Sequence, residues 1–201
     1  MTRSTNPPAV ALWLLERLGP RNESVAGDIA ERFAAHSHSA AWAWRQVLAT
    51  IVVAAVRDIR GHKLLAMTSV VVGFSLIQSF AVFFGGLVVN RVSGHGGDID
   101  AALVMWPIWS AGFVAIGVVI ARMSRPVHAA MVLLFASVVM LVSMFDNYGL
   151  LKDALERPVF WSRLLLFVSR DVTWALCVVA GGVWANTTAS VARLGELRAK
   201  D

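Results

Sequence analysis

The sequence contains long stretches without a charged residue. Four stretches contain no Asp, Glu, Lys or Arg: residues 64–90, 101–121, 126–145 and 172–192. A helix needs about 20 mostly apolar residues to cross a hydrocarbon core about 30 Å thick, and each stretch reaches that length. The 201 residues are 57% hydrophobic, whereas soluble domains average about 45–50%. We therefore predict an all-α integral membrane protein with four transmembrane helices.

Cysteine is almost absent as well. The one cysteine, Cys177, lies inside the fourth stretch, which excludes an intramolecular disulfide and a multi-cysteine metal site. We interpret it as a packing residue. The sequence contains no Walker motif, so a P-loop ATPase is excluded for this chain. It also carries no signature of a catalytic, cofactor or metal site. We therefore predict a protein that is not an enzyme and holds no cofactor.

Lysine and arginine gather at alternate ends of the four stretches. They precede the first stretch, lie between the second and third, and follow the fourth, at Arg57, Arg60, Lys63, Arg122, Arg125, Arg193, Arg198 and Lys200. Because these residues accumulate on the cytoplasmic side of short loops, we expect cytoplasmic N- and C-termini. Anionic lipid then accounts for the net charge of +5, and we predict no nucleic-acid binding.

The segment 146–171 is too long for a simple turn and mixes apolar residues with charges of both signs. Pro158 is expected to interrupt a helix there. We favour one or two short helices that lie on the outer leaflet, with Trp161 at the level of the headgroups. In the alternative, the fourth helix begins near Phe160. For Arg170 and Asp171 we favour a paired interfacial role over a functional ion site.

Residues 1–60 are more polar and predict a small helical module. We expect helices from the residues after Pro8 to Leu18, from about Glu23 to Ala35 and from about Ala40 to Arg60, separated by Gly19-Pro20 and by His36-Ser37-His38-Ser39. The predicted organisation is thus a cytosolic module at 1–60, a transmembrane bundle at 61–192 and a cytoplasmic tail at 193–201.

The third of these helices is predicted to be amphipathic. One face collects apolar residues, namely Trp44, Val47, Leu48, Ile51, Val52 and Ala55, while Gln46, Arg57 and Arg60 lie opposite. Such a helix fits the cytoplasmic membrane interface, or packs on the first two helices. It could also continue directly into the first span, but Gly61-His62 favours a bend between them.

Several short sequence elements in this module follow a recognisable order. They are Pro8-x-x-Ala11-x-x-Leu14-Leu15, Gly19-Pro20, Val25-x-Gly27-Asp28-Ile29-x-Glu31-x-Phe33 and Ala43-Trp44-Arg45-Gln46-Val47-Leu48. Over residues 7–60 the chain resembles the permease prefix domain, a helical module that precedes ABC transporter permeases of the macrolide-exporter type in many bacteria. The remainder departs from that family, because such permeases carry a large extracytoplasmic domain where this chain has only the ten residues 91–100.

The resemblance implies a shared cytosolic module and no export activity of its own. We therefore expect a small non-enzymatic inner-membrane protein, an accessory or interaction subunit of an ABC-type export complex. Asp28, Glu31 and Arg45 are the candidate partner-contact residues, although helix capping and ion pairing explain them equally well. The expected partners are the lipid bilayer, a component of an ABC transporter, or a second copy of the chain.

Polar side chains in the first span form a candidate intramembrane site. Ser75, Gln78 and Ser79 need partners in lipid, and we expect Gln78 to bond another helix. These residues also support an alternative function, a small-solute transporter or channel that works as an oligomer. In that case they would line a shared cavity with Asn186.

Two further features of the spans have competing interpretations. Small residues four apart favour close helix packing within the bundle or between copies, at Ala111–Ala115, Gly117–Ala121 and Gly181–Ala185. His62 and His128 both fall near the cytoplasmic ends, which leaves a membrane redox subunit that binds haem or quinone as a third function. For these histidines we favour an interfacial position beside basic residues.

Overall fold

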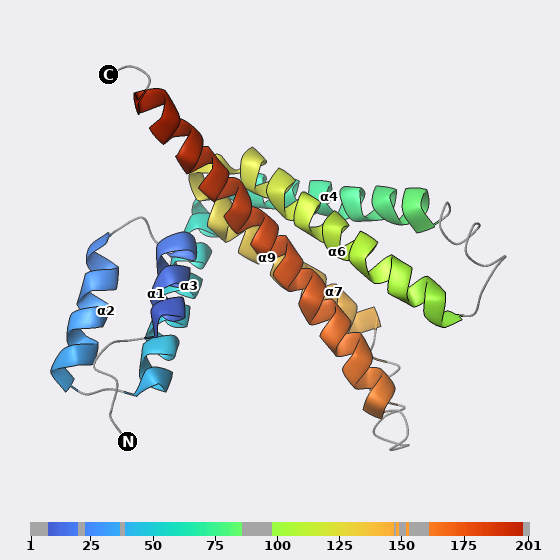
Figure 1. Ribbon diagram of the computed structural model, residues 1–201, viewed down its shortest axis with the longest axis horizontal. Coiled ribbons are helices and arrows are strands. Elements are labelled where there is room, and N and C mark those ends of the chain that lie inside the picture. The colour runs from blue at the N-terminus through green and yellow to red at the C-terminus, as the bar shows by residue number, and fades with distance from the viewer. Residues whose placement is uncertain are drawn as a thin grey trace. The chain divides into compact units, whose positions relative to one another are not determined.

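The computed structural model is helical throughout the residues that it describes, which are 8–19, 23–36, 39–85, 98–146, 148, 152 and 161–198. Within these residues seven α-helices and two short helical turns follow one another (Figure 1). No strand occurs among them, so the all-α prediction is confirmed. The chain divides into two compact units, residues 1–63 and 64–201, and each is described by itself.

The helices of the N-terminal unit are α1 (Ala9–Leu18), α2 (Glu23–His36) and α3 (Ala40–Gly61). The second unit contains α4 (Lys63–Phe80), the π-helical turn η1 (Ala81–Gly85), α6 (Asp98–Met123), the 3-10 turn η2 (Arg125–Val127), α7 (His128–Asp146) and α9 (Trp161–Arg198). Four described segments are long and apolar enough to cross a membrane: Lys63–Phe83, Trp106–Met123, His128–Phe145 and Leu165–Thr188. Their number agrees with the four stretches identified in the sequence.

The fourth apolar segment begins earlier than the charge-free stretch 172–192 indicates. α9 starts at Trp161 and continues as one helix of 38 residues, which includes part of the predicted tail. Arg170 and Asp171 are tolerated inside it because they pair with each other, Nη2 to Oδ1, at 2.9 Å. The favoured interpretation of separate short helices is therefore wrong for residues 161–171, and the alternative, in which the fourth helix begins near Phe160, agrees with the structure there. Residues 149–151 and 153–160 lie outside the described part of the chain.

The N-terminal unit is held together by one apolar face from each of its three helices. α1 buries Ala11, Leu15 and Leu18, α2 buries Ile29 and Phe33, and α3 buries Ala43, Val47 and Ile51. These residues recur every three or four positions, as a helix that covers a core requires. Ser39 begins α3 by accepting a hydrogen bond at its hydroxyl from the backbone N–H of Trp42, at 3.3 Å.

The predicted apolar face of α3 is divided between two environments. Val47 and Ile51 are buried against α1 and α2, whereas Leu48 and Val52 are 51% and 59% exposed. The structure thus shows the packing of α3 on the first two helices, and it leaves a second apolar strip open. His62, with φ −129° and ψ 50°, separates α3 from α4, so the interruption expected at Gly61-His62 is present.

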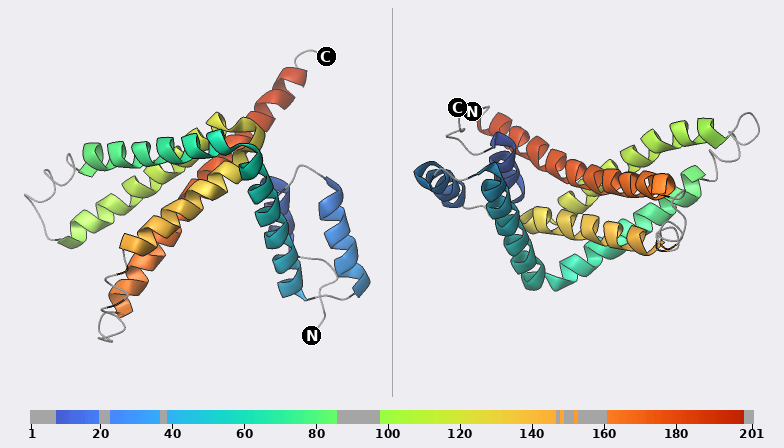
Figure 2. Two further views of the ribbon diagram at one scale, coloured as in Figure 1. Left: turned by 180° about the vertical axis from the view of Figure 1, so that it is seen from behind. Right: turned by 90° about the horizontal axis from the view of Figure 1, so that it is seen from below.

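The core of the second unit is formed by α6, α7 and α9, which lie together in both views of Figure 2. Gly117 of α6 lies against the backbone of Val178, and Gly181 of α9 lies against the backbone of Val114. A side chain at either glycine would collide with main-chain atoms, so the two helices approach backbone to backbone. The close packing predicted for the small residues is confirmed at these two glycines, while Ala111 and Ala115 are exposed.

α7 and α4 complete the packing of this unit. Phe135 of α7 is fully buried, and its ring fills the space left by the missing side chain of Gly73 in α4. The same ring meets Phe74 edge to face, with 5.8 Å between ring centroids. A second contact places the ring of Phe80 against Gly112 of α6. α4 therefore touches the bundle through one narrow face that also contains Ala66 and Ser69.

Candidate interaction groove and intramembrane polar residues

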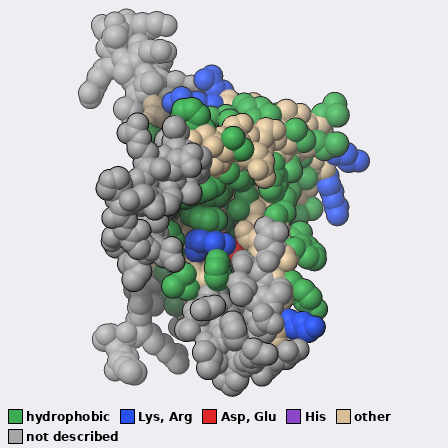
Figure 3. Space-filling model, turned by 90° about the vertical axis from the view of Figure 1, so that its right-hand side faces the viewer, with side chains coloured by type: hydrophobic (Ala, Val, Ile, Leu, Met, Phe, Trp, Pro, Cys, Tyr) green, Lys and Arg blue, Asp and Glu red, His purple; other side chains and the backbone are tan. Residues whose placement is uncertain are grey.

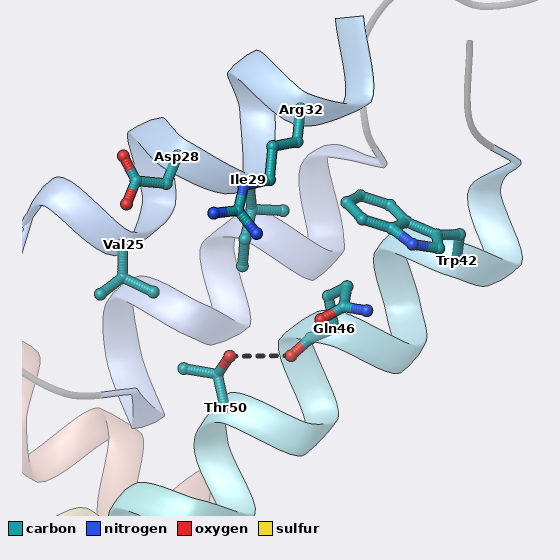
Figure 4. Close-up of a pocket in the computed structure, with 7 residues that line it drawn as sticks. All are labelled: Val25, Asp28, Ile29, Arg32, Trp42, Gln46 and Thr50. Carbon is teal, nitrogen blue, oxygen red and sulfur yellow. Dashed lines mark hydrogen bonds between the residues drawn. The ribbon is translucent and has the colours of Figure 1, made fainter. Parts of the chain in front are cut away.

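A groove of about 210 Å³ lies between α2 and α3 of the N-terminal unit (Figure 4). Its walls come from both helices, with Val25, Asp28, Ile29 and Arg32 on α2 and Trp42, Gln46 and Thr50 on α3. The hydroxyl of Thr50 donates a hydrogen bond to the backbone oxygen of Gln46 at 2.9 Å. The side-chain amide of Gln46 lines the groove and has no hydrogen bond within the described residues.

The spacing of residues along the two helices explains why the groove has this composition. On α2 the pairs 25/29 and 28/32 are four residues apart, and on α3 positions 42, 46 and 50 are also four apart, so each set forms one row. On α2 the row of Val25 and Ile29 continues to Phe33, and on α3 Val47 follows Gln46; Phe33 and Val47 are both buried. The groove is therefore the polar margin of a packed helix pair.

The groove joins two sequence elements on which the family resemblance rests. Asp28 belongs to the element Gly27-Asp28-Ile29-x-Glu31-x-Phe33, and Gln46 belongs to Trp44-Arg45-Gln46-Val47-Leu48. Both residues line the groove, whereas its described lining does not include Glu31 or Arg45. Those two side chains are exposed elsewhere on α2 and α3. Of the three candidate contact residues, the structure places only Asp28 at this site.

The chemistry of the groove suits a segment of protein. Ile29 supplies an apolar floor, Asp28 and Arg32 carry opposite charges on one wall, and Trp42 presents an indole on the other. Asp28 and Arg32 are exposed and form no ion pair in the described part of the chain. Aromatic residues and arginine are enriched at protein interfaces, and the rim of an interface is polar. Sequence reasoning missed Arg32 and Trp42, which the four-residue spacing from Asp28 and Gln46 could have indicated.

The candidate intramembrane residues share one exposed side of α4. Ser75, Gln78 and Ser79 are all exposed, and none has a hydrogen-bond partner in the described part of the molecule. Asn186 is half-buried on α9. The structure thus brings the first three residues together and directs them away from the bundle interior.

Arg170 and Asp171 lie beside an aromatic cluster that the sequence did not reveal. The guanidinium of Arg170 lies over the rings of Phe167 and Trp174, 4.6 Å from each centroid, and its Nε donates to Asp171 Oδ1 at 3.0 Å. Trp174 stacks on Phe113 at 5.0 Å and lies 5.6 Å from Trp109. The guanidinium of Arg170 neutralises the buried carboxylate of Asp171, and the aromatic faces bind that guanidinium, which supports a structural pairing.

The two histidines of the haem hypothesis contact their own helices. His62 Nδ1 lies 3.0 Å from the backbone oxygen of Asp58, and His128 Nδ1 lies 3.3 Å from that of Arg125. Among the described residues, no group of three or more His, Cys, Asp and Glu side chains could hold a metal ion. The half-buried Cys177 lies in α9 and forms no disulfide.

No protein-family model, curated protein or solved structure matches this chain. The resemblance of residues 7–60 to the permease prefix domain therefore stays a hypothesis that rests on the sequence elements themselves.

Proposed function

We propose that this chain is a non-enzymatic, multi-pass protein of the bacterial inner membrane that presents a helical cytosolic module to a partner protein. The groove between α2 and α3 carries the proposal, because it unites Asp28 and Gln46 from the two sequence elements of the resemblance in one site. In this proposal the partner is a component of an ABC-type export complex, and a segment of that component occupies the groove.

The surface of the second unit supports a membrane anchor. Hydrophobic side chains cover most of the described surface in Figure 3, with a few basic groups among them. Large apolar residues are exposed along every candidate span, including Val71 on α4, Val119 on α6, Leu141 on α7 and Leu176 on α9. Exposed apolar area of this extent is costly in water and favourable in hydrocarbon. The basic residues Arg122 and Arg125 at the turn between α6 and α7 agree with a cytoplasmic position of that turn and of both termini.

The groove can be tested with two tryptophan variants of one helix. Gln46→Trp fills the groove, whereas Ala49→Trp places the same side chain on an exposed position three residues away. The full-length protein would be cross-linked in its native membrane, purified in mild detergent and analysed by mass spectrometry. We expect an ABC permease or ATPase to copurify with the wild type and with Ala49→Trp, and its yield to fall about tenfold or more with Gln46→Trp. Equal recovery with both variants would exclude the groove as the contact site.

A second candidate function is the oligomeric transporter or channel. The observation that favours it is the outward direction of Ser75, Gln78 and Ser79, since a pore between copies would need polar groups on the outside of each chain. Uptake of small solutes into proteoliposomes that contain only this protein distinguishes the two functions. Transport by the protein alone would support the second and count against an accessory role.

A further inference from the structure

α4 is the least covered of the four candidate spans. Only 17% of its apolar window is buried within the chain, compared with 28–33% for the other three. Its covered side is the narrow row of Ala66, Ser69 and Gly73. The opposite side carries exposed residues along the whole candidate span Lys63–Phe83, including Leu64 and Val71 of α4 and Val82 of η1, which are 82%, 62% and 76% exposed.

Gln78 is the residue of this face whose hydrogen-bonding groups lipid cannot pair. A buried amide without hydrogen bonds costs several kcal/mol in hydrocarbon. Serine and threonine hydroxyls can bond to their own helix, as Thr68 does to the backbone oxygen of Leu64 at 2.8 Å. The longer side chain of Gln78 is exposed and has no hydrogen bond in the described part of the chain, so a neighbouring molecule in the membrane can supply its partner.

The face of α4 has the repeat of a helix that pairs with an equivalent helix. Leu64, Val71 and Gln78 are spaced seven residues apart and are all exposed, which is the repeat of one position of a coiled-coil heptad. A single polar amide at such a position fixes the register of two helices. The small side chains of Ser75 and Ser79 on the same side allow the two backbones to approach.

A second copy of the chain offers matching hydrogen-bonding groups at the same depth in the membrane. A carboxamide has a donor and an acceptor, so its electrostatic complement is another carboxamide. Two copies that insert in the same orientation have parallel α4 helices, and a two-fold axis along the membrane normal then places Gln78 of each copy at the same depth. Each amide can donate to the oxygen of the other.

We propose that the exposed face of α4, defined by Leu64, Val71, Ser75, Gln78 and Ser79, is the interface of a parallel homodimer whose register is set by hydrogen bonds between the two Gln78 side chains. This inference rests on the proposed membrane insertion of α4. It is independent of the groove between α2 and α3.

Self-association can be measured in lipid with matched variants. Protein labelled with a donor or an acceptor fluorophore would be reconstituted in liposomes at a series of protein-to-lipid ratios, and energy transfer would give the dimer fraction. Gln78→Leu removes the amide and keeps an apolar residue at an exposed position. Ser137→Leu is the control, because Ser137 is an exposed polar residue of α7 whose hydroxyl bonds to its own helix.

The wild type and Ser137→Leu are expected to dimerise equally well, whereas Gln78→Leu dimerises about tenfold more weakly because it loses interhelical hydrogen bonds. Gln78→Asn, which keeps the amide, recovers part of the affinity. Proteoliposomes that retain the protein after carbonate washing establish insertion independently. If the wild type is retained in the membrane but stays monomeric, the homodimer is contradicted while insertion stands. If carbonate removes the protein from the membrane, both the homodimer and the insertion are contradicted.

Cysteine cross-linking tests the location of the interface. In a Cys177→Ala background, Val71→Cys or Ser75→Cys, both of which keep Gln78, is expected to form a disulfide between copies on mild oxidation. Met144→Cys, at an exposed position of α7, is expected to remain monomeric. Efficient cross-linking at position 144 but not at 71 and 75 would place the interface elsewhere. Cross-linking of position 71 or 75 to a different protein, with no homodimer, would equally contradict the proposal.

Discussion

Gly117 and Gly181 each lie against the backbone of the other's helix at one crossing of α6 and α9. Gly117 meets the carbonyl of Val178, and Gly181 meets the carbonyl of Val114. Gly117 lies three residues after Val114, and Gly181 lies three residues after Val178. The two contacts therefore lie on either side of the point where the helices cross. A helix pair of this kind gains its stability from close van der Waals contact, which a single added carbon atom disrupts.

Alanine at this crossing is expected to destabilise the second unit. A β-carbon at Gly181 would collide with main-chain atoms, which cannot rotate away, so Gly181→Ala should cost about 1–3 kcal/mol or more. That loss exceeds the gain of about 0.5–1 kcal/mol that alanine normally brings to a helix interior. Thermal unfolding in mild detergent, followed by circular dichroism, measures the difference.

The same substitution in α2 is expected to have the opposite sign. A β-carbon at Gly27 would meet no atom within 4 Å. Gly27→Ala should therefore stabilise the N-terminal unit by about 0.4–1 kcal/mol, since only the helix propensity changes. A fall in unfolding temperature of that unit would show that position 27 makes a contact that the described residues do not contain.

Removal of one member of the Arg170–Asp171 pair is expected to be far more damaging than removal of both. Arg170→Leu leaves the buried carboxylate of Asp171 without its guanidinium and should cost about 3–5 kcal/mol. The double variant Arg170→Leu with Asp171→Leu should recover most of that loss, because apolar residues often replace a buried pair at little cost. The unfolding temperatures of the two variants in mild detergent measure the difference, and a double variant no more stable than Arg170→Leu would contradict the prediction.

Phe33 is expected to be essential for the groove, although it does not line it. Its ring is only 3% exposed between α2 and its neighbours. Phe33→Ala should lower the stability of the N-terminal unit by about 3–5 kcal/mol and abolish partner recovery. Trp13→Ala is the control, because Trp13 is exposed on α1. Proteolysis of the variants in native membranes would separate loss of the folded module from loss of a contact.

The proposed orientation can be tested at the two ends of α7. In the Cys177→Ala background, Met123→Cys lies at the turn before α7 and Tyr148→Cys lies just after it, and both positions are exposed. We expect a membrane-impermeant maleimide to label position 123 in inside-out vesicles and position 148 in right-side-out vesicles. Labelling of both from the same side would mean that α7 does not cross the bilayer.

Most of the secondary structure could be predicted because its causes are local. Apolar runs without charge gave four candidate spans, and Gly19 and His62 interrupt helices where expected. The start of α9 could not be decided from the sequence. A span bounded by its nearest charges begins after Arg170 and Asp171, because the sequence shows them as two separate charges. Their pairing and the rings of Phe167 and Trp174 depend on side-chain geometry that composition does not contain.

The candidate groove was less predictable than the helices that form it. Val47 and Leu48 are adjacent and equally apolar, but only the first is buried, because the position of α1 and α2 decides which side of α3 is covered. For the same reason Asp28 and Gln46 could be identified individually, while their presence in one groove depends on the distance between two helices. Glu31 and Arg45 share the neighbouring sequence but point elsewhere.

α9 is a continuous helix of 38 residues. At about 1.5 Å per residue it measures about 57 Å, nearly twice the thickness of a hydrocarbon core of about 30 Å. In the proposed membrane arrangement, a helix of this length extends beyond the hydrocarbon core as a stiff rod. If α9 changed its tilt slightly about its crossing with α6, its two ends would move sideways by several ångströms. The contacts of Gly117 and Gly181 would then mark the point about which the helix turns.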